Sequence, residues 1–456
     1  LLRETLDALS AAGLSLGPVN AADGETPPGD RAAGALAWRG ARARGRAAAV
    51  GPAPARDALV VGAGLAGAAC AAALARRGWR VARIDRGHAM HDAGSLQPVL
   101  AQHPSVTPDD APLSRLTRAA TLLAGAVAGA DALRPVGRVQ AADDALAERA
   151  TRTLPAGWVR AVDAREASAR AGVALRRGGL WLPRACSADP LALREAWTPA
   201  GLRVVEGRRV ERLVRTGEVW RALDADGRCI AEAPVALLAC GADALPAVDG
   251  ADRPGSALDA LWASAGLRRR TGTTTVAHAP AGALPRCIVG GDGHAVPIDA
   301  TRVLLGPGGA PEDDDGGSGE DVAARAWRRW ADRLVAPPET PPLTPGRPGT
   351  RLSARDHLPI AGPVTGAGSG AGSRVGSAPL AGPSVGPGPD APGLWIAAAL
   401  GGRGLLWSVL CAELIAAALE HEPSPLEHAL ARHLDPRRFD RRRPDPRARR
   451  GPDTAG

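Results

Sequence analysis

One pattern of strand, turn and helix near residue 58 restricts the start of the fold more than any other feature. Residues 59–61 (Leu-Val-Val) form a short apolar run of the kind that builds a buried parallel strand. Three glycines spaced G-x-G-x-x-G follow at once, and an Ala-rich predicted helix then runs to Arg77. Residues 80–85 form a second predicted strand, which an aspartate closes 23 residues after the first glycine. This succession predicts a βαβ unit of a Rossmann-like sheet, the unit that binds a dinucleotide at its first turn.

Each residue of this pattern has a physical reason to be present. Gly62 permits the tight turn after the strand, and Gly64 lets the backbone approach a pyrophosphate. Gly67 lets the helix pack closely against the strand. Free N–H groups at the helix start stabilise phosphate charge, and Asp85 accepts hydrogen bonds from the adenosine ribose. We therefore predict a dinucleotide site, and the motif alone leaves FAD and NAD as alternatives.

The composition is that of a globular protein of 456 residues, long enough for two or three domains. Its basic residues are all arginine, and the whole chain is biased towards Ala, Arg, Gly and Pro. The net charge of +8 is therefore only weak support for a polyanionic partner. The six cysteines form no CxxC pair, so we predict no metal site and no disulfide framework. No apolar run reaches membrane-spanning length, and we expect a soluble, cytoplasmic protein.

Compositional shifts divide the chain. We expect residues 1–17 to form a helix and residues 18–56, rich in Ala, Gly, Pro and Arg, to form a linker. Residues 307–320 and 364–392 are rich in Gly with Asp, Ser or Pro, which predicts two mobile surface insertions. Residues 441–456 belong to an Arg- and Pro-rich tail, for which we predict disorder.

Further elements are expected between these stretches. Residues 203–214 and 218–224 are predicted to form a hairpin, and residues 235–239 a buried strand. A last buried strand, over 395–399, precedes a Gly-rich turn and a helix predicted for residues 405–420.

Several segments, in order and spacing, resemble the FAD-dependent oxidoreductase module of the bifunctional tRNA-modifying family MnmC, within the D-amino-acid-oxidase-like flavoenzymes. The resemblance runs from about residue 57 to 440. It is carried by the βαβ unit; DDAPLSRLTRAA, residues 109–120; GGLWLPRACSADPLALREAW, 178–197; ALLACGADAL, 236–245; RLSARDHLPIAGPV, 351–364; the strand, turn and helix over 393–419; and LDPRRF, 434–439.

The resemblance implies an α/β fold in which a Rossmann-like FAD-binding domain is joined to a mostly antiparallel α+β substrate domain. The FAD-binding domain would comprise about residues 57–130, 178–250 and 351–420. The substrate domain would comprise about residues 131–177 and 251–350. The related proteins also carry a methyltransferase domain, of which residues 1–56 would be the end.

The resemblance also decides for FAD, and no Cys or His stands at a spacing that implies covalent attachment, so we expect non-covalent FAD. The N–H groups of the Gly-rich turn would face the flavin pyrimidine, where reduced flavin carries negative charge. Beside the three motif glycines and Asp85, the predicted cofactor-binding residues are Leu65, Ala66, Arg86, Gly241, Gly401, Gly402, Gly404 and Leu405.

The reaction implied by the resemblance removes the carboxymethyl group from 5-carboxymethylaminomethyl(-2-thio)uridine at the tRNA wobble position. The partners would then be tRNA and oxygen, and we expect a monomer. Such a site needs a cation for the substrate carboxylate, and Arg351 and Arg403 are the candidates. For each of them, a surface arginine in an Arg-rich chain is the alternative.

Two other functions fit the same residues. A free amino-acid oxidase of the glycine or sarcosine oxidase type shares the fold, the flavin and the carboxylate clamp. A remnant that binds FAD or RNA without activity is the second alternative. It would explain why residues 87–91 (Gly-His-Ala-Met-His) lack the Ser and Asn of the family, and why the chain has no Tyr.

Overall fold

The computed structural model describes residues 15–16, 37–38, 56–87, 97–128, 132–154, 157–241, 247–249, 257–306, 319–364 and 393–439. The chain divides into two compact units, Leu1–Ala55 and Arg56–Gly456. In the first unit, the described residues form one antiparallel pair of strands, β1 (Ser15–Leu16) and β2 (Ala37–Trp38). Among the described residues, no helix is long and apolar enough to cross a membrane.

The second unit is built around a six-stranded sheet whose order is β11-β4-β3-β15-β23-β22. All neighbouring strands run parallel except β22, which lies antiparallel to β23 at one edge. The strands are β3 (Asp57–Val61), β4 (Arg80–Ile84), β11 (Arg203–Val205), β15 (Val235–Leu238), β22 (Ile360–Pro363) and β23 (Leu394–Ala398).

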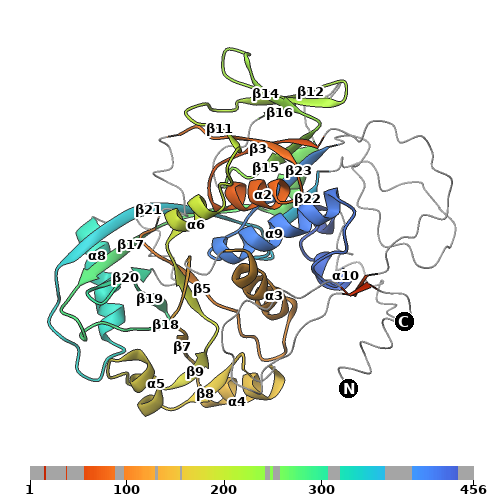
Figure 1. The fold of residues 1–456 in the computed structure, drawn as a ribbon. Coiled ribbons are helices and arrows are strands. Elements are labelled where there is room, and N and C mark those ends of the chain that lie inside the picture. Colours follow the sequence, from red (N-terminus) through yellow and green to blue (C-terminus); the bar gives the residue numbers. More distant parts are fainter. Residues whose placement is uncertain are drawn as a thin grey trace, which may run out of the picture. The chain divides into compact units, whose positions relative to one another are not determined.

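Both faces of this sheet are covered, which explains why its strands are apolar throughout. One face packs on α2 (Leu65–Ala75), α3 (Pro112–Val127) and α9 (Gly404–Leu419), and Val60 belongs to this core. Leu59 points the other way, into a core shared with a four-stranded sheet that includes Trp220. Figure 1 shows that sheet on one side of the parallel strands and α2 and α9 on the other. Its strands are β12 (Arg212–Thr216), β13 (Val219–Leu223), β14 (Cys229–Ala233) and β16 (Ala247–Asp249).

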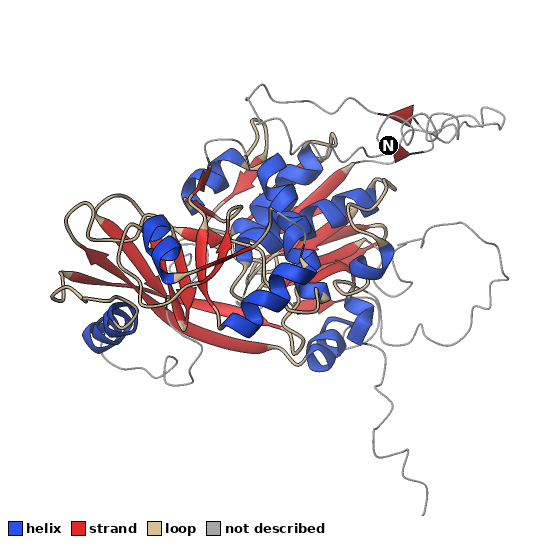
Figure 2. Cartoon of the chain, turned by 90° about the horizontal axis from the view of Figure 1, so that it is seen from below, coloured by secondary structure: helices blue, strands red, loops and turns tan. Residues whose placement is uncertain are grey.

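The second large sheet has eight strands in the order β21-β17-β20-β19-β18-β7-β9-β8, mostly antiparallel. In Figure 2 its strands spread out beside the helices of the parallel sheet. The strands are β7 (Arg138–Ala141), β8 (Arg160–Val162), β9 (Gly179–Leu182), β17 (Arg268–His278), β18 (Ile288–Gly291), β19 (Gly293–Pro297), β20 (Arg302–Gly306) and β21 (Leu343–Ser353). The helices α4 (Asp144–Thr153), α5 (Ala164–Ala171) and α8 (Gly319–Ala331) accompany it.

A third small sheet, in the order β5-β10-β6, and short helices complete the unit. These elements are β5 (Leu100–Gln102), β6 (Leu133–Pro135), β10 (Cys186–Ala188), α6 (Pro190–Ala196), α7 (Ala257–Ala265), α10 (His428–Ala431) and the 3-10 helix η3 (Pro436–Phe439). The predicted fold class is confirmed: a parallel, helix-covered sheet is joined to a mostly antiparallel one.

Some boundaries differ from the sequence prediction. The predicted FAD-binding part includes β9, but β9 pairs with β7 and β8 in the eight-stranded sheet. All four residues of β9 are buried, so its sequence has no alternation that assigns it to a sheet. The predicted 203–214 strand is also wrong in part, because β11 pairs with β4, and only β12 and β13 form the hairpin.

Other predictions fall mostly outside the described residues. The helix predicted for residues 1–17 lies outside them except at β1, where the structure has a strand. The insertions lie outside at 307–318 and 365–392, whereas Gly319 already belongs to α8. The tail at 441–456 also lies outside.

Candidate active site

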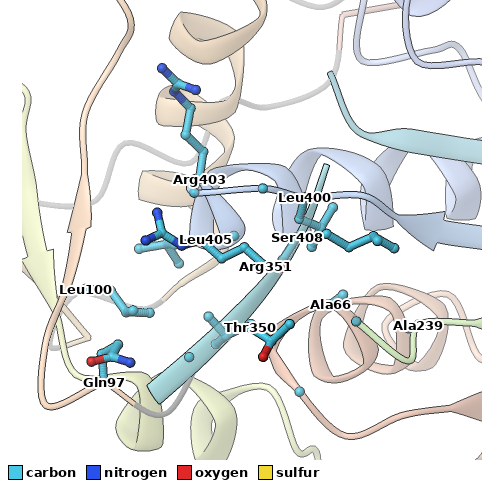
Figure 3. A pocket seen from close by; sticks show the side chains of 18 of the residues that line it. Ala66, Gln97, Leu100, Ala239, Thr350, Arg351, Leu400, Arg403, Leu405 and Ser408 are labelled. Atoms are coloured by element: carbon cyan, nitrogen blue, oxygen red, sulfur yellow. The ribbon is translucent and has the colours of Figure 1, made fainter. Parts of the chain in front are cut away.

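A cavity of about 560 Å³ lies where the parallel strands end and the two large sheets meet. The carboxyl ends of β3, β4, β15 and β23 all contribute to its wall, as expected for a ligand site in an open α/β sheet. Every predicted site residue except Gly67 lines it. Figure 3 shows labelled side chains around this space, among them Gln97 from the segment before β5 and Thr350 and Arg351 from β21.

The turn after β3 has glycines at positions where a side chain would collide with neighbouring backbone. Gly62 has a φ of +109°, and a Cβ on it would overlap the carbonyl oxygen of Ala239 at the end of β15. A Cβ on Gly67 would overlap the carbonyl oxygen of Gly62, so α2 can approach the strand only with glycine at this position. Gly64 is the N-cap of α2 and has no capping side chain, so the first N–H groups of the helix remain available for an anion.

Asp85 stands directly after β4 and holds the turn from the other side. Its Oδ2 accepts a hydrogen bond from the N–H of Ala63 at 2.7 Å, and its Oδ1 accepts one from Gly87 at 2.9 Å. Each carboxylate oxygen can accept a second bond, so the ribose role predicted for Asp85 is compatible with both contacts. The bare turn, the open helix end and this carboxylate together fit the nucleotide part of a dinucleotide.

A second glycine-rich turn closes the cavity between β23 and α9. Gly401 has a φ of +53°, and its N–H donates to the carbonyl oxygen of Leu352 on β21 at 2.9 Å. A Cβ on Gly402 would lie 3.3 Å from Nη1 of Arg351, so the guanidinium of Arg351 lies beside this turn. The turn therefore joins the end of the parallel sheet to the strand that carries a predicted substrate residue.

Arg351 and Arg403 both line the cavity, and their side chains point in different directions. Figure 3 shows the side chain of Arg403 extending away from Arg351. Burial lowers the pKa of Arg403, and its Nε has no hydrogen-bond partner among the described residues. A buried guanidinium without an anion is unfavourable, so this charge is available to an anionic ligand.

Arg138 on β7 was not among the predicted site residues, but it also lines the cavity and is only 8% exposed. Burial, followed by the charges of Arg403 and Arg333, lowers its pKa to about 10, so it remains charged at pH 7. A single arginine at the start of a short strand carries no motif, and only its pairing within the eight-stranded sheet places it here.

Two histidines line the same part of the cavity and stay neutral. Burial and the charges of Arg138, Arg351 and Arg333 lower the pKa of His294 to about 4. His103 has a pKa well below its ordinary value, chiefly because of burial and then because of Arg138. Asp85 supplies the one carboxylate among the described lining residues, so the substrate-side wall is cationic.

Comparison with known proteins identifies the family of the chain. Residues 57–418 match the family model DAO, FAD dependent oxidoreductase. The chain is 36% identical over 415 residues to the tRNA 5-methylaminomethyl-2-thiouridine biosynthesis bifunctional protein MnmC of Ralstonia nicotianae, and 34% identical over 417 residues to that of Burkholderia multivorans. Both alignments cover 85% of this chain, which spans 60% of the length of each relative.

Solved structures show the same fold. Glycine oxidase from Geobacillus kaustophilus matches with a TM-score of 0.58 at 21% identity, covering 82% of this chain and 96% of that one. Iminodiacetate oxidase from Chelativorans sp. BNC1 matches with a TM-score of 0.57 at 21% identity, covering 81% and 97%. Because the family model spans most of the chain and the cavity has the matching turns, the protein belongs to the DAO family of FAD-dependent oxidoreductases, and FAD is its cofactor.

Proposed function

We propose that the protein oxidatively removes the carboxymethyl group from 5-carboxymethylaminomethyl(-2-thio)uridine at the wobble position of tRNA, leaving 5-aminomethyl(-2-thio)uridine. The proposal is supported by the cationic wall of the cavity, which suits a substrate carboxylate. It is also supported by the names of the relatives, which are proteins of 5-methylaminomethyl-2-thiouridine biosynthesis.

The reaction balances as a two-electron oxidation. The secondary amine, oxygen and water give the primary amine, glyoxylate and hydrogen peroxide. When bound, FAD would supply the oxidation of the C–N bond as the acceptor of a hydride from the carbon next to the amine. The remaining work falls to the protein: it must hold the carboxylate, keep the amine neutral and admit water for hydrolysis of the imine.

In this proposal FAD is held non-covalently by the turn at Gly62–Gly67, by Asp85 and by the turn at 401–404. The start of α9 lies at the cavity wall, so the positive end of this helix would stabilise negative charge on the cofactor. The other proposed cofactor contacts are Leu65, Ala66, Arg86, Gly241 and Leu405, all of which line the cavity.

Arg351 binds the substrate carboxylate in this proposal, and Arg403 supports the same charge from the turn before α9. The cationic wall also favours the uncharged amine over its ammonium form, because like charges repel in a buried site. Hydride transfer needs the lone pair of the uncharged amine. The neutral imidazole of His294 lies on that wall and is able to accept its proton.

The test uses purified holoprotein and tRNA that carries 5-carboxymethylaminomethyluridine. We expect anaerobic bleaching of the flavin absorbance by this tRNA, formation of glyoxylate in air, and no bleaching by glycine or sarcosine. Bleaching by the free amino acids alone would instead assign a free amino-acid oxidase. Protein that retains FAD but is bleached by none of these compounds would contradict any amine-oxidising function.

A variant separates the role of Arg351 from folding. Arg351→Met removes a charge-assisted bond to the carboxylate, for which we expect a 10- to 100-fold loss of kcat/KM, corresponding to about 1.5–3 kcal/mol. The matched control is Arg268→Met on the paired strand β17, two residues from the partner of Arg351, where the side chain is exposed and outside the cavity. Equal losses in both variants would show that Arg351 has no specific role.

A further inference from the structure

Arg138 occupies a place that the surrounding strands are shaped to hold. Its Nε donates a hydrogen bond to Oε1 of Gln140 at 3.0 Å, and its Nη2 donates to the same oxygen. On the neighbouring strand β18, Gly290 pairs with Gln140, and a Cβ there would overlap Nη2 and Cζ of Arg138. A glycine on one strand therefore makes room for a guanidinium that a neighbouring strand supplies.

A second glycine makes room for a polar side chain on the strands beside Arg138. His294 on β19 pairs with Gly306 on β20, and a Cβ on Gly306 would overlap the imidazole ring. The two glycines let large polar side chains lie flat over this face of the sheet, and Arg138 and His294 both line the cavity. An apolar face would have been the ordinary outcome for a covered sheet, so this polar patch requires a ligand to explain it.

No carboxylate of the described residues neutralises Arg138. Its printed bonds go to one neutral amide oxygen, and Nη1 makes no hydrogen bond to any described residue. The charged groups that act on it most are Arg403 and Arg333, and both repel it. A buried cation among other cations is costly, and an anionic ligand at this point would remove that cost.

Arg138 and Arg351 stand on strands that lie far apart in the order of the eight-stranded sheet. Five strand-to-strand steps separate β7 from β21 in the sheet order, which is about 24 Å in a flat sheet at about 4.8 Å per step. His294, on a strand between them, is within the electrostatic influence of both. The two arginines therefore form the ends of an elongated cationic wall rather than one clamp.

We propose that Arg138, oriented by Gln140 and accommodated by Gly290, is a second anion-binding point, so that the site selects a substrate amine that carries two separate acidic groups. One acidic group is the carboxylate next to the oxidised carbon, which Arg351 binds. The second is an anionic oxygen group on the far side of the amine. This inference rests on the proposed function only for the first carboxylate.

Two sources supply that second group. It is either a second carboxylate, as in an N-carboxymethyl amino acid, or the phosphate of the nucleotide that bears the modified base. Both present oxygens to a guanidinium in the same way. Pairs of ligands that differ only in the second anion therefore distinguish the two sources, and analogues without the amine avoid turnover during the measurement.

The experiment is isothermal titration calorimetry with the FAD-loaded protein. One pair is methoxyacetate and diglycolate, and the other is 5-carboxymethyluridine and its 5′-monophosphate. We expect the doubly acidic member of one pair to bind at least tenfold more tightly, and that pair identifies the source. No preference in either pair, including no binding of any ligand, would overturn the proposal.

Variants assign the preference to Arg138. Arg138→Met removes the guanidinium, and Gly290→Ala keeps the charge but displaces it, so both should reduce the preference to less than threefold. Arg160→Met on β8 of the same sheet, exposed and outside the cavity, should keep it. FAD absorbance and Tm report folding, and Gly290→Ala decides if Arg138→Met does not fold. If folded Arg138→Met or Gly290→Ala keeps the preference for the doubly acidic ligand, the proposal is wrong. Failure of the tRNA assay alone would contradict only the proposed function.

Discussion

His294 makes the stability of the protein depend on pH. Burial and neighbouring arginines lower its pKa from the ordinary 6.5 to about 4. The unfolded chain therefore binds more protons than the native protein between these values, so the free energy of unfolding falls as pH decreases from about 6.5 towards 4. For this group alone we expect a loss of about 2 kcal/mol between pH 7.5 and pH 5, measured by urea unfolding.

A substitution isolates the contribution of His294 to the pH dependence of the free energy of unfolding. His294→Asn should flatten the pH dependence by a similar amount, and the part that remains includes His103, whose pKa is lowered in the same direction. His428→Asn, at an exposed position on α10, is the control. If His294→Asn and the control show the same slope as the unmodified protein, the imidazole is not held neutral by its surroundings.

At the scale of single residues, the sequence was informative where chemistry is tied to a motif. Gly62 and Asp85 are recognisable because their spacing is fixed by the turn that they build, and they meet in the cavity. Arg138 was not recognisable, because its importance depends on a glycine more than a hundred residues later, at position 290. Roles for these residues remain predictions, whereas their meeting in one cavity is a property of the fold.

At the scale of elements, the contact between α2 and the turn after β3 is the most sensitive. Gly67→Ala places a methyl group against the carbonyl oxygen of Gly62, so either the helix or the turn must move. We expect a destabilisation of about 1–3 kcal/mol, and weaker FAD binding because the turn is displaced. Thermal unfolding and the FAD content of the purified protein measure the two effects.

An exposed helical glycine is the control for that substitution. Gly125 lies in α3, where a Cβ would have no heavy atom within 4 Å. Gly125→Ala should therefore stabilise the protein by about 0.5–1 kcal/mol through helix propensity alone. Loss of FAD in both variants would show that the tight contact at Gly67 is not responsible.

Elements with strong local signals were predictable from the sequence: β3, β15, β23 and α9 lie within a residue or two of their expected positions. Pairing over long distances was not. The predicted hairpin strand at 203 instead joins β4, because two exposed residues and one half-buried residue carry no preference for one partner. A buried run such as β9 fits either sheet, and only tertiary packing decides between them.

For the whole molecule, the two compact units suggest a simple division. All the strands of both large sheets lie between Asp57 and Ala398, within the second unit. We therefore expect a chain that begins at Arg56 to bind FAD stoichiometrically and to unfold within about 2 °C of the full chain, which for a unit of this size corresponds to a difference of about 2 kcal/mol or less. Absorbance and thermal unfolding of both chains provide the measurement, and loss of FAD on truncation would contradict it.

The edge strand β22 runs against the direction of the other strands, and this has a practical consequence. The chain leaves β22 at Pro363 opposite Trp395, so the connection to β23 joins the sheet at the end remote from the cavity. The ligand-bearing ends of the strands are set without reference to the length of that connection. A fluorescent protein or affinity domain inserted into the connection between β22 and β23 would therefore leave the cavity side of the sheet unchanged. This connection is the position best suited to such an insertion.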